Sequence, residues 1–183
     1  KKIILFPARI TSWKGQLEFI DVIKKIDTQN IFVLFAGDTK NESYTKLVRD
    51  KIKQNNLDGV CKILGSINQD EMRSLYEVAD LSVSFPLRAE GFGRTVSESL
   101  YSKTPVLAFD YGGVKNQLAN LSDMFKVKPQ DFQILPSKIE KLLSLSEVEK
   151  KEALEGVQSV IESNFSKINM VKQYLKLYES FKS

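Results

Sequence analysis

Short apolar runs alternate with longer amphipathic segments along most of this chain. The apolar runs predict six strands, at 2–6, 31–35, 60–64, 81–85, 105–109 and 124–127. Apolar residues spaced three and four apart predict helices at 14–26, 42–55, 69–78, 96–101, 114–118, 132–143, 147–163 and 168–181. Because strands alternate with helices and are apolar almost throughout, we expect an α/β fold, namely a Rossmann-like, doubly wound parallel six-stranded sheet with helices on both faces.

Four turns at the ends of these strands carry unusual residues, at 7–15, 36–39, 65–68 and 86–94. Since the carboxyl ends of parallel strands lie along one edge of a sheet, we expect all four turns to open on that edge. Ligands of such sheets bind there, near the point where the strand order reverses. Two helix starts also carry capping boxes, Asn68 with Glu71 and Ser146 with Glu149, to which we assign a structural role alone.

The turn after the fourth strand has the sequence E-G-F-G-R-T-V-S-E, from Glu90 to Glu98. Backbone N–H groups at the start of a helix are unpaired and carry partial positive charge, so a glycine-bearing turn of this kind suits a phosphate group. The two carboxylates would repel phosphate, and we expect their partners to be hydroxyl groups such as those of a ribose and a hexose. Phosphate-binding amides beside hydroxyl-binding acids predict a nucleotide-sugar site.

Each of these acids also has a structural explanation. Glu90 could be a solvated loop acid. The stretch Thr95-Val96-Ser97-Glu98 is a capping-box pattern, in which Glu98 would reach back to the Thr95 N–H. Taken alone, this spacing slightly favours the cap over a ribose contact. The pair Gly112-Gly113 leaves open whether the backbone approaches a ligand there or makes only a tight turn.

Arg9 and Lys14 lie between the first strand and the next helix, where cations could neutralise the charge of a diphosphate leaving group. An exposed arginine and a lysine in the first helical turn would explain the same residues without a ligand. A lysine there is unfavourable against the helix dipole, which favours a role in binding. We expect Trp13, beside Lys14, to be partly buried against the sheet.

The chain has 183 residues, 42% of them apolar, which is enough for one large domain with its own core. Its net charge of +4, from 27 Lys and Arg against 23 Asp and Glu, comes without the basic stripe of a nucleic-acid-binding protein. The absence of histidine excludes Ser-His, Cys-His and His-metal chemistry, and no close acidic pair is present to hold a divalent metal. No apolar run approaches the about 18 residues of a transmembrane helix.

Cys61 is the only cysteine, so an internal disulfide is impossible and a reducing, cytoplasmic compartment fits. Because Cys61 lies in an apolar run, we expect a buried and inert thiol. The chain opens on Lys1-Lys2 directly before a strand, without an initiator methionine. We therefore expect a fragment cut at a domain boundary.

Over about residues 2–118, these features together resemble the carboxyl-terminal, nucleotide-sugar-binding half of the retaining GT-B glycosyltransferases of family 4. The matching motifs are R-x4-K-G at Arg9, Lys14 and Gly15, then F-A-G-D, L-G-S-I, E-G-F-G-R-T-V-S-E, and S-L-Y-S-K-T-P-V-L-A-F running on to Gly112-Gly113. Thr39 and Asn116 depart from the family pattern, which often has a glycine and an acid at these places.

The resemblance implies that the donor is contacted by Arg9, Lys14, Gly15, Gly37, Ser66, Ile67, Glu90, Gly91, Phe92, Gly93, Arg94, Thr95, Val96 and Glu98. Within this set it assigns the diphosphate to Arg9 and Lys14, together with the amides near Thr95 and Val96. It assigns the ribose to Glu98.

By the same resemblance, Glu90 and the amides of Phe92 and Gly93 face the donor sugar, and the base lies against the backbone near Ser66 and Ile67. The residues implied in catalysis are Glu90, Arg9 and Lys14. No metal and no cofactor is implied, because the nucleoside diphosphate sugar is the substrate.

The activity implied is a retaining, metal-independent transfer of a hexosyl group from a nucleoside diphosphate such as UDP to a glycan or lipid-linked acceptor. A second, amino-terminal domain would bind the acceptor, and the terminal helix within 166–183 would pack toward it, although it could instead pack on its own sheet. A non-catalytic nucleotide-binding or scaffold domain and a GT-B sugar-nucleotide epimerase stay open as alternatives. A dehydrogenase is disfavoured, because no G-x-G-x-x-G follows the first strand. The intact enzyme is expected in the cytoplasm, with a peripheral position on the inner face of a membrane left open.

Overall fold

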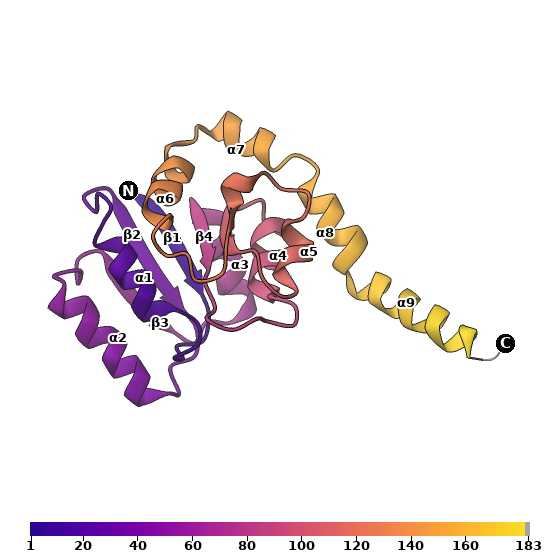
Figure 1. Cartoon of the computed structure of the whole chain (residues 1–183), viewed down its shortest axis with the longest axis horizontal. Helices are drawn as coiled ribbons and strands as arrows, with labels where there is room; N and C mark the ends of the chain where they lie inside the picture. The colour runs from indigo at the N-terminus through magenta and orange to yellow at the C-terminus, as the bar shows by residue number, and fades with distance from the viewer. Residues whose placement is uncertain (182–183) are drawn as a thin grey trace.

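A six-stranded parallel sheet forms the centre of the computed structural model, which describes residues 1–181 (Figure 1). Its strands are β1 (Lys2–Pro7), β2 (Ile31–Ala36), β3 (Cys61–Gly65), β4 (Leu81–Ser84), β5 (Val106–Phe109) and β6 (Lys126–Val127). They lie in the order β3-β2-β1-β4-β5-β6, and every neighbouring pair is parallel. The predicted doubly wound sheet is confirmed, and its strand order reverses between β1 and β4.

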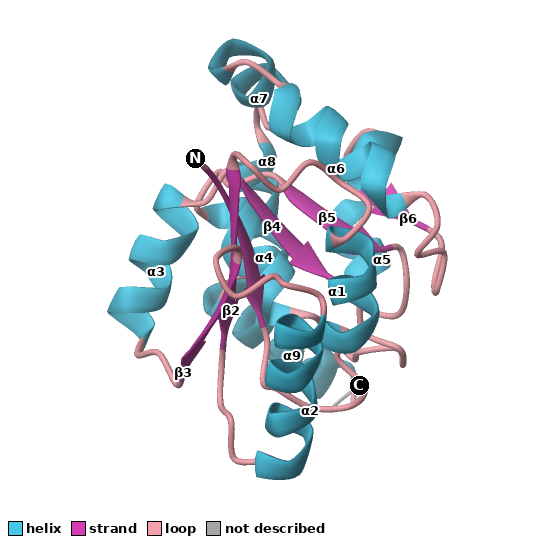
Figure 2. Cartoon of the chain, turned by 90° about the vertical axis from the view of Figure 1, so that its left-hand side faces the viewer, coloured by secondary structure: helices cyan, strands magenta, loops and turns pink. Residues whose placement is uncertain are grey.

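Helices cover both faces of this sheet, as predicted (Figure 2). The elements are α1 (Gln16–Ile23), α2 (Glu42–Gln54), α3 (Gln69–Val78), α4 (Arg94–Tyr101), α5 (Val114–Leu118), α6 (Leu135–Ser144), α7 (Glu147–Ala153), α8 (Val157–Phe165) and α9 (Lys167–Ser180). A short 3₁₀ turn (Asp123–Phe125) precedes β6. Helices α1, α2 and α6 pack on one face, and α3, α4 and α8 on the other.

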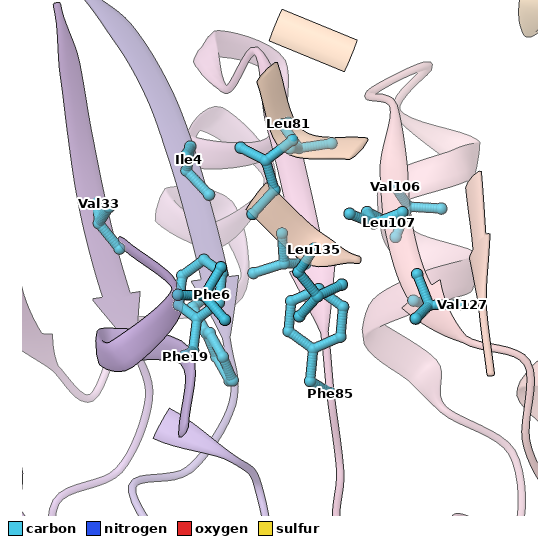
Figure 3. Packing of buried hydrophobic residues seen from close by; sticks show 14 of the residues in the cluster. Ile4, Phe6, Phe19, Val33, Leu81, Phe85, Val106, Leu107, Val127 and Leu135 are labelled. Atoms are coloured by element: carbon cyan, nitrogen blue, oxygen red, sulfur yellow. The ribbon is translucent and has the colours of Figure 1, made fainter. Parts of the chain in front are cut away.

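Aromatic side chains fill the core between the sheet and the α1 face. The rings of Phe6 and Phe19 have centroids 5.4 Å apart, and those of Phe19 and Phe85 are 5.5 Å apart. Figure 3 shows Leu135 of α6 packed beside them. Burying a side chain of this size contributes about 1.5–3 kcal/mol, so these residues hold the ends of β1 and β4 firmly together.

The two capping boxes to which we assigned a structural role, and the buried thiol, are confirmed. Both capping boxes form, at the starts of α3 and α7. Cys61 is buried, and burial raises the pKa of its thiol to about 12, which leaves it protonated and inert.

Two of the differences between the predicted and the observed helices follow from glycines. Helix α1 begins at Gln16, two residues later than predicted, because Gly15 adopts a left-handed conformation with φ 84° as its N-cap. Lys14 therefore lies ahead of the helix and not in its first turn. The helix predicted at 147–163 is two helices, α7 and α8, because the chain turns at Gly156 with φ 71°.

Helix α9 extends away from the body of the molecule (Figure 1). None of its residues is buried, and it packs principally against the end of α8. Its exposed apolar side chains include Ile168, Val171, Tyr174, Leu175 and Tyr178, so the alternative that this helix packs on its own sheet is wrong. Within residues 1–181, no helix is both long enough and apolar enough to cross a bilayer.

Candidate functional site

Two loops meet where the strand order reverses: residues 8–15 after β1 and residues 85–93 after β4. The Leu87 N–H donates to the Trp13 carbonyl at 2.7 Å. A Cβ atom on Gly15 would lie 2.3 Å from the Phe85 carbonyl oxygen, so only glycine allows this approach. The loops are thus joined at the place where α/β sheets bind their ligands.

Lys14 and Glu90 form an ion pair across these two loops. Their side chains are only 12% and 13% exposed, so each charge depends on the other for compensation. The second carboxylate oxygen of Glu90, Oε2, is buried and has no hydrogen-bond partner within residues 1–181. A ligand hydroxyl that donates to this oxygen would remove the cost of leaving it unpaired.

Trp13 covers the same lysine. Its side chain is half-buried, as predicted, and the Lys14 ammonium lies 4.3 Å from the ring centroid. Lys14 is therefore held between an aromatic face and a carboxylate, which fixes its position before any ligand arrives.

Gly112 and Gly113 support the Glu90 loop from behind. The Gly113 N–H donates to the Glu90 carbonyl at 2.9 Å. Cβ atoms on Gly112 and Gly113 would lie 2.5 Å from the Glu90 oxygen and 2.1 Å from the Gly91 oxygen. The glycine pair lies in a turn, with Gly112 at φ 58°, as one of the sequence-based alternatives expects, and it also allows this turn and the Glu90 loop to approach closely.

Gln117 of α5 also holds this loop, and sequence reasoning missed it. Its side chain is buried, its Nε2 donates to the Phe92 carbonyl, and its Oε1 accepts from Ser97 Oγ at 3.0 Å. No spacing or motif distinguishes this glutamine from other polar residues, so the sequence carries no signal for its role.

The start of α4 lies directly beside Glu90. Gly93 is its N-cap in a left-handed conformation, and a Cβ atom there would lie 2.4 Å from Val114 Cγ2. Arg94 and Thr95 occupy the first turn, where N–H groups lack intrahelical acceptors. The Val96 N–H already donates to the Gly93 carbonyl at 3.0 Å, so the amides available for an anion are those of Arg94 and Thr95.

The capping box predicted at Thr95 is wrong, because the helix begins at Arg94, two residues earlier than predicted, and has no side-chain cap. Glu98 instead accepts a hydrogen bond from the hydroxyl of Tyr76 at 3.0 Å. Tyr76 belongs to α3, so this contact ties α3 to α4. No sequence pattern signals the pairing, since the two residues lie 22 positions apart.

Arg9 is exposed on the β1 loop, and its carbonyl accepts from Gln16 Nε2 at 2.8 Å. Gly37 packs beneath this loop, since a Cβ atom on it would lie 2.1 Å from the Ala8 carbonyl oxygen. Ser66 is exposed and Ile67 half-buried at the end of β3, two strands from β1. At about 4.8 Å per strand, they stand about 10 Å from the Arg9 loop along the same sheet edge.

Gly91 and Phe92 are exposed at the tip of the Glu90 loop. The ring of Phe92 packs edge-on against Phe165, the last residue of α8, with centroids 5.5 Å apart. Within residues 1–181, no group of three or more His, Cys, Asp or Glu side chains is arranged to hold a metal ion.

Lys14, Glu90 and the first turn of α4 thus lie together at the carboxyl edge of the sheet, and the sequence of residues 1–155 matches the family model described as glycosyl transferases group 1. This chain belongs to that family. Its six-stranded sheet with flanking helices is the Rossmann-like architecture of one half of a GT-B glycosyltransferase.

Three relatives and structural neighbours illustrate the match. A trehalose synthase from Thermococcus litoralis is 28% identical over 190 residues, which cover 99% of this chain and 45% of that protein. A glycosyltransferase structure from Rickettsia africae superposes with a TM-score of 0.89 at 30% identity, over 98% of this chain and 47% of the other. An Anabaena protein solved with UDP-glucose has the same fold, with a TM-score of 0.85, 22% identity, and coverage of 97% and 48%. The chain spans about half the length of the curated relatives it matches.

Proposed function

We propose that this chain binds a nucleoside diphosphate sugar, with UDP as the nucleotide, and forms the donor-binding half of a retaining glycosyltransferase. The observation that carries the proposal is the ion pair of Lys14 with Glu90, made across two loops beside the start of α4. The pair brings together a lysine that could bind a phosphate group and a glutamate whose unpaired oxygen could accept a hydrogen bond from a hydroxyl group. The UDP-glucose complex of the Anabaena neighbour supports the choice of nucleotide.

The donor would lie along the carboxyl edge of the sheet. We place the diphosphate against Arg9, Lys14 and the first-turn amides of α4. The base would extend toward Ser66 and Ile67, about 10 Å from β1 along this edge. The ribose would then meet Glu98.

The hexose would occupy the other end of this path. Glu90 Oε2 would accept from one of its hydroxyls, with the amides of Phe92 and Gly93 and the backbone of Gly91 alongside. Lys14 would then be shared between Glu90 and the phosphate, so donor binding converts an internal ion pair into a contact among three charged groups. Gly15 and Gly37 contribute by letting these loops approach.

The proposed reaction breaks the bond between the anomeric carbon and the diphosphate oxygen. Negative charge grows on the departing diphosphate, and Lys14 and Arg9 stabilise it without a metal ion. Retention follows if the acceptor hydroxyl attacks from the face that the diphosphate leaves, with a phosphate oxygen taking the hydroxyl proton. The acceptor is a hydroxyl of a glycan or of a lipid-linked sugar.

A second domain would complete the cleft. The chain covers 45% of its trehalose synthase relative, and the exposed apolar side of α9 has no cover within residues 1–181. We propose that an amino-terminal domain of the intact protein packs against α9 and binds the acceptor. The 183-residue chain is then expected to bind the donor nucleotide but to transfer sugar poorly. We place the intact enzyme in the cytoplasm.

A thermal-unfolding panel tests the proposal. The chain is heated with UDP, GDP, ADP and their glucose conjugates, each with and without magnesium. At a hundred times its dissociation constant, a bound nucleotide stabilises the folded chain by about 2.7 kcal/mol. Stabilisation by UDP and UDP-glucose without magnesium is the expected result. No response to any nucleotide would contradict donor binding, and a response that requires magnesium would contradict the metal-free site.

A pair of variants separates phosphate from sugar recognition. We expect Lys14→Ala to weaken the binding of UDP and of UDP-glucose equally, because both ligands carry the diphosphate. We expect Glu90→Gln to change the affinity for UDP, because Glu90 also pairs with Lys14, and in addition to lose the extra affinity of UDP-glucose over UDP, because only the sugar supplies a hydroxyl to Oε2. Titration calorimetry measures both, with Lys53→Ala, an exposed lysine on α2, as the matched control. A Glu90→Gln variant with unchanged preference for UDP-glucose would remove Glu90 from the sugar site.

A further inference from the structure

A buried phenol lies behind the acid that the proposed function assigns to the ribose. Tyr76 is only 2% exposed, and its hydroxyl donates to Glu98 Oε2 at 3.0 Å. Tyr76 belongs to α3 and Glu98 to α4, so the bond spans two helices that pack side by side on one face of the sheet.

We propose that Tyr76 is a positioning residue for donor recognition, whose hydroxyl fixes the Glu98 carboxylate in the orientation that accepts the ribose hydroxyls. This inference rests on the proposed function, since it concerns the same site. Tyr76 does not touch the ligand. It acts by holding the group that does.

Glu98 needs such support because it lies on an exposed part of α4. A glutamate side chain there has several rotamers, and binding a ligand in one of them would lose that freedom. A carboxylate has two oxygens and about four acceptor sites, so a single donor can hold Oε2 while the remaining sites stay open to two hydroxyl groups. Fixing a group in its bound orientation before the ligand arrives strengthens binding.

Tyr76 is itself held in place from behind. Thr104 Oγ1 donates to the Tyr76 carbonyl at 2.6 Å, and Ser99 Oγ of α4 donates to the Thr104 carbonyl at 3.1 Å. The Tyr76 side chain belongs to a small core cluster with Leu5 and Ala36. The phenol is therefore a rigid support whose position is set by the sheet and by the loop that follows α4.

The phenol also keeps its proton. Burial and the adjacent negative charge of Glu98 both raise the pKa of the Tyr76 hydroxyl well above its usual range. The hydroxyl therefore donates the hydrogen bond that Glu98 Oε2 accepts.

The test compares two probes on one set of variants: UDP, and 2′,3′-dideoxy-UDP, which lacks both ribose hydroxyls. Titration calorimetry on the 183-residue chain gives both affinities. We expect Tyr76→Phe to weaken the binding of UDP about tenfold, because Glu98 loses the modest hydrogen bond that orients its carboxylate. The binding of dideoxy-UDP should be unchanged. A merely structural tyrosine would affect both probes equally.

Tyr44→Phe is the matched control. Tyr44 is another buried tyrosine, on α2, and no side chain within residues 1–181 pairs with its hydroxyl. We expect this variant to bind both probes as the unchanged chain does. Thermal unfolding of all variants verifies that each is folded at the temperature of the titration.

Glu98→Ala separates the inference from the proposed function. Suppose that Glu98→Ala weakens the binding of UDP but not of dideoxy-UDP, and that adding Tyr76→Phe to this variant weakens it no further. The ribose contact of Glu98 and the positioning role of Tyr76 are then both supported. If Glu98→Ala is selective but Tyr76→Phe is not, the positioning role is overturned while the ribose contact survives. If the unchanged chain binds both probes equally well, or binds neither, the ribose contact fails and the inference fails with it.

Discussion

At the scale of single residues, the ion pair of Lys14 and Glu90 decides how the site behaves. Both side chains are nearly excluded from solvent, so each would be an uncompensated charge without the other. If the proposed donor binds here, its phosphate group would meet a lysine that is already oriented and already partnered. The acid would then keep the cation in place until the ligand takes a share of its charge.

Lys14→Ala should therefore affect the chemical step as well as binding. In the intact enzyme we expect the barrier to rise by about 2.7–4 kcal/mol, the range for losing one preorganised donor that stabilises developing negative charge. Steady-state kinetics measure this higher barrier as a fall in kcat/KM. The control variant Lys53→Ala should keep the kcat/KM of the unchanged enzyme. A loss confined to KM, with kcat retained, would show that Lys14 binds the donor without assisting its departure.

Gly15 offers a second test at this scale. We expect Gly15→Ala to destabilise the chain by about 1–3 kcal/mol from its left-handed backbone alone, with a further loss from contact with the Phe85 carbonyl. Gly59→Ala is the control, because nothing lies within 4 Å of a Cβ atom there. Urea unfolding compares the two. Equal stability of both variants would mean that the loops after β1 and β4 do not need their close approach.

At the scale of elements, helix caps made by neighbouring residues are predictable from the sequence, whereas the backbone conformation of the glycines at turns is not. The caps at Asn68 and Ser146 are predictable because the whole motif lies within four consecutive residues. The cap expected at Thr95 is absent because Gly93, in a left-handed conformation, starts α4 before the capping pattern begins. The break at Gly156 escapes prediction because a single glycine inside an amphipathic pattern is compatible with either a helix or a turn.

Asp80 joins three elements at the opposite edge of the sheet from the site. It accepts from Lys2 Nζ at 2.8 Å, from the Ile3 N–H at 2.9 Å and from Lys150 Nζ at 3.3 Å. Partial burial opposes its charge, but these hydrogen bonds outweigh burial and lower the pKa of the carboxyl. The start of β1, the start of β4 and helix α7 are therefore held by one charged side chain.

Asp80→Asn should accordingly destabilise the chain in a pH-dependent way. We expect a loss of about 1–3 kcal/mol at pH 7, the range for hydrogen bonds to a charged group. A lowered folded-state pKa stabilises the chain fully above the unfolded value of about 3.9, and this stabilisation is lost as the pH falls through the folded value. The difference between the two chains should thus shrink below about pH 4.

Urea unfolding across about pH 3.5 to 7 measures this difference, with Glu147→Gln as the control. Glu147 also pairs with Lys150, but its side chain is 83% exposed, and such pairs contribute little. A pH-independent difference for Asp80→Asn would show that its charge is not what holds the elements.

At the scale of the whole molecule, the strand–helix alternation is sufficient to predict the sheet and the edge at which the loops gather. The partners across that edge are not predictable. Gln117 and Tyr76 act on residues 25 and 22 positions away, through contacts that only the packing of helices creates. A sequence pattern records which residues are near in the chain, whereas these pairings depend on how α3, α4 and α5 lie against one another.

Helix α9 should contribute little to the stability of this chain. We expect removal of residues 167–183 to change the free energy of unfolding by less than about 1 kcal/mol, because side chains that stay exposed add no burial. Ile161→Ala, at a buried position of α8, should by contrast cost about 2–5 kcal/mol. Thermal and urea unfolding compare the two. A large loss of stability on truncation would mean that α9 is part of this domain's own fold and not a surface on which another domain packs.

The contact of Phe92 with Phe165 links the two ends of this architecture. Phe165 is followed at once by Ser166, the residue from which α9 departs. A rotation of α9 about that serine would therefore shift Phe165 and, with it, the tip of the loop that carries Glu90. A partner bound to α9 would in this way change the shape of that loop without contacting it.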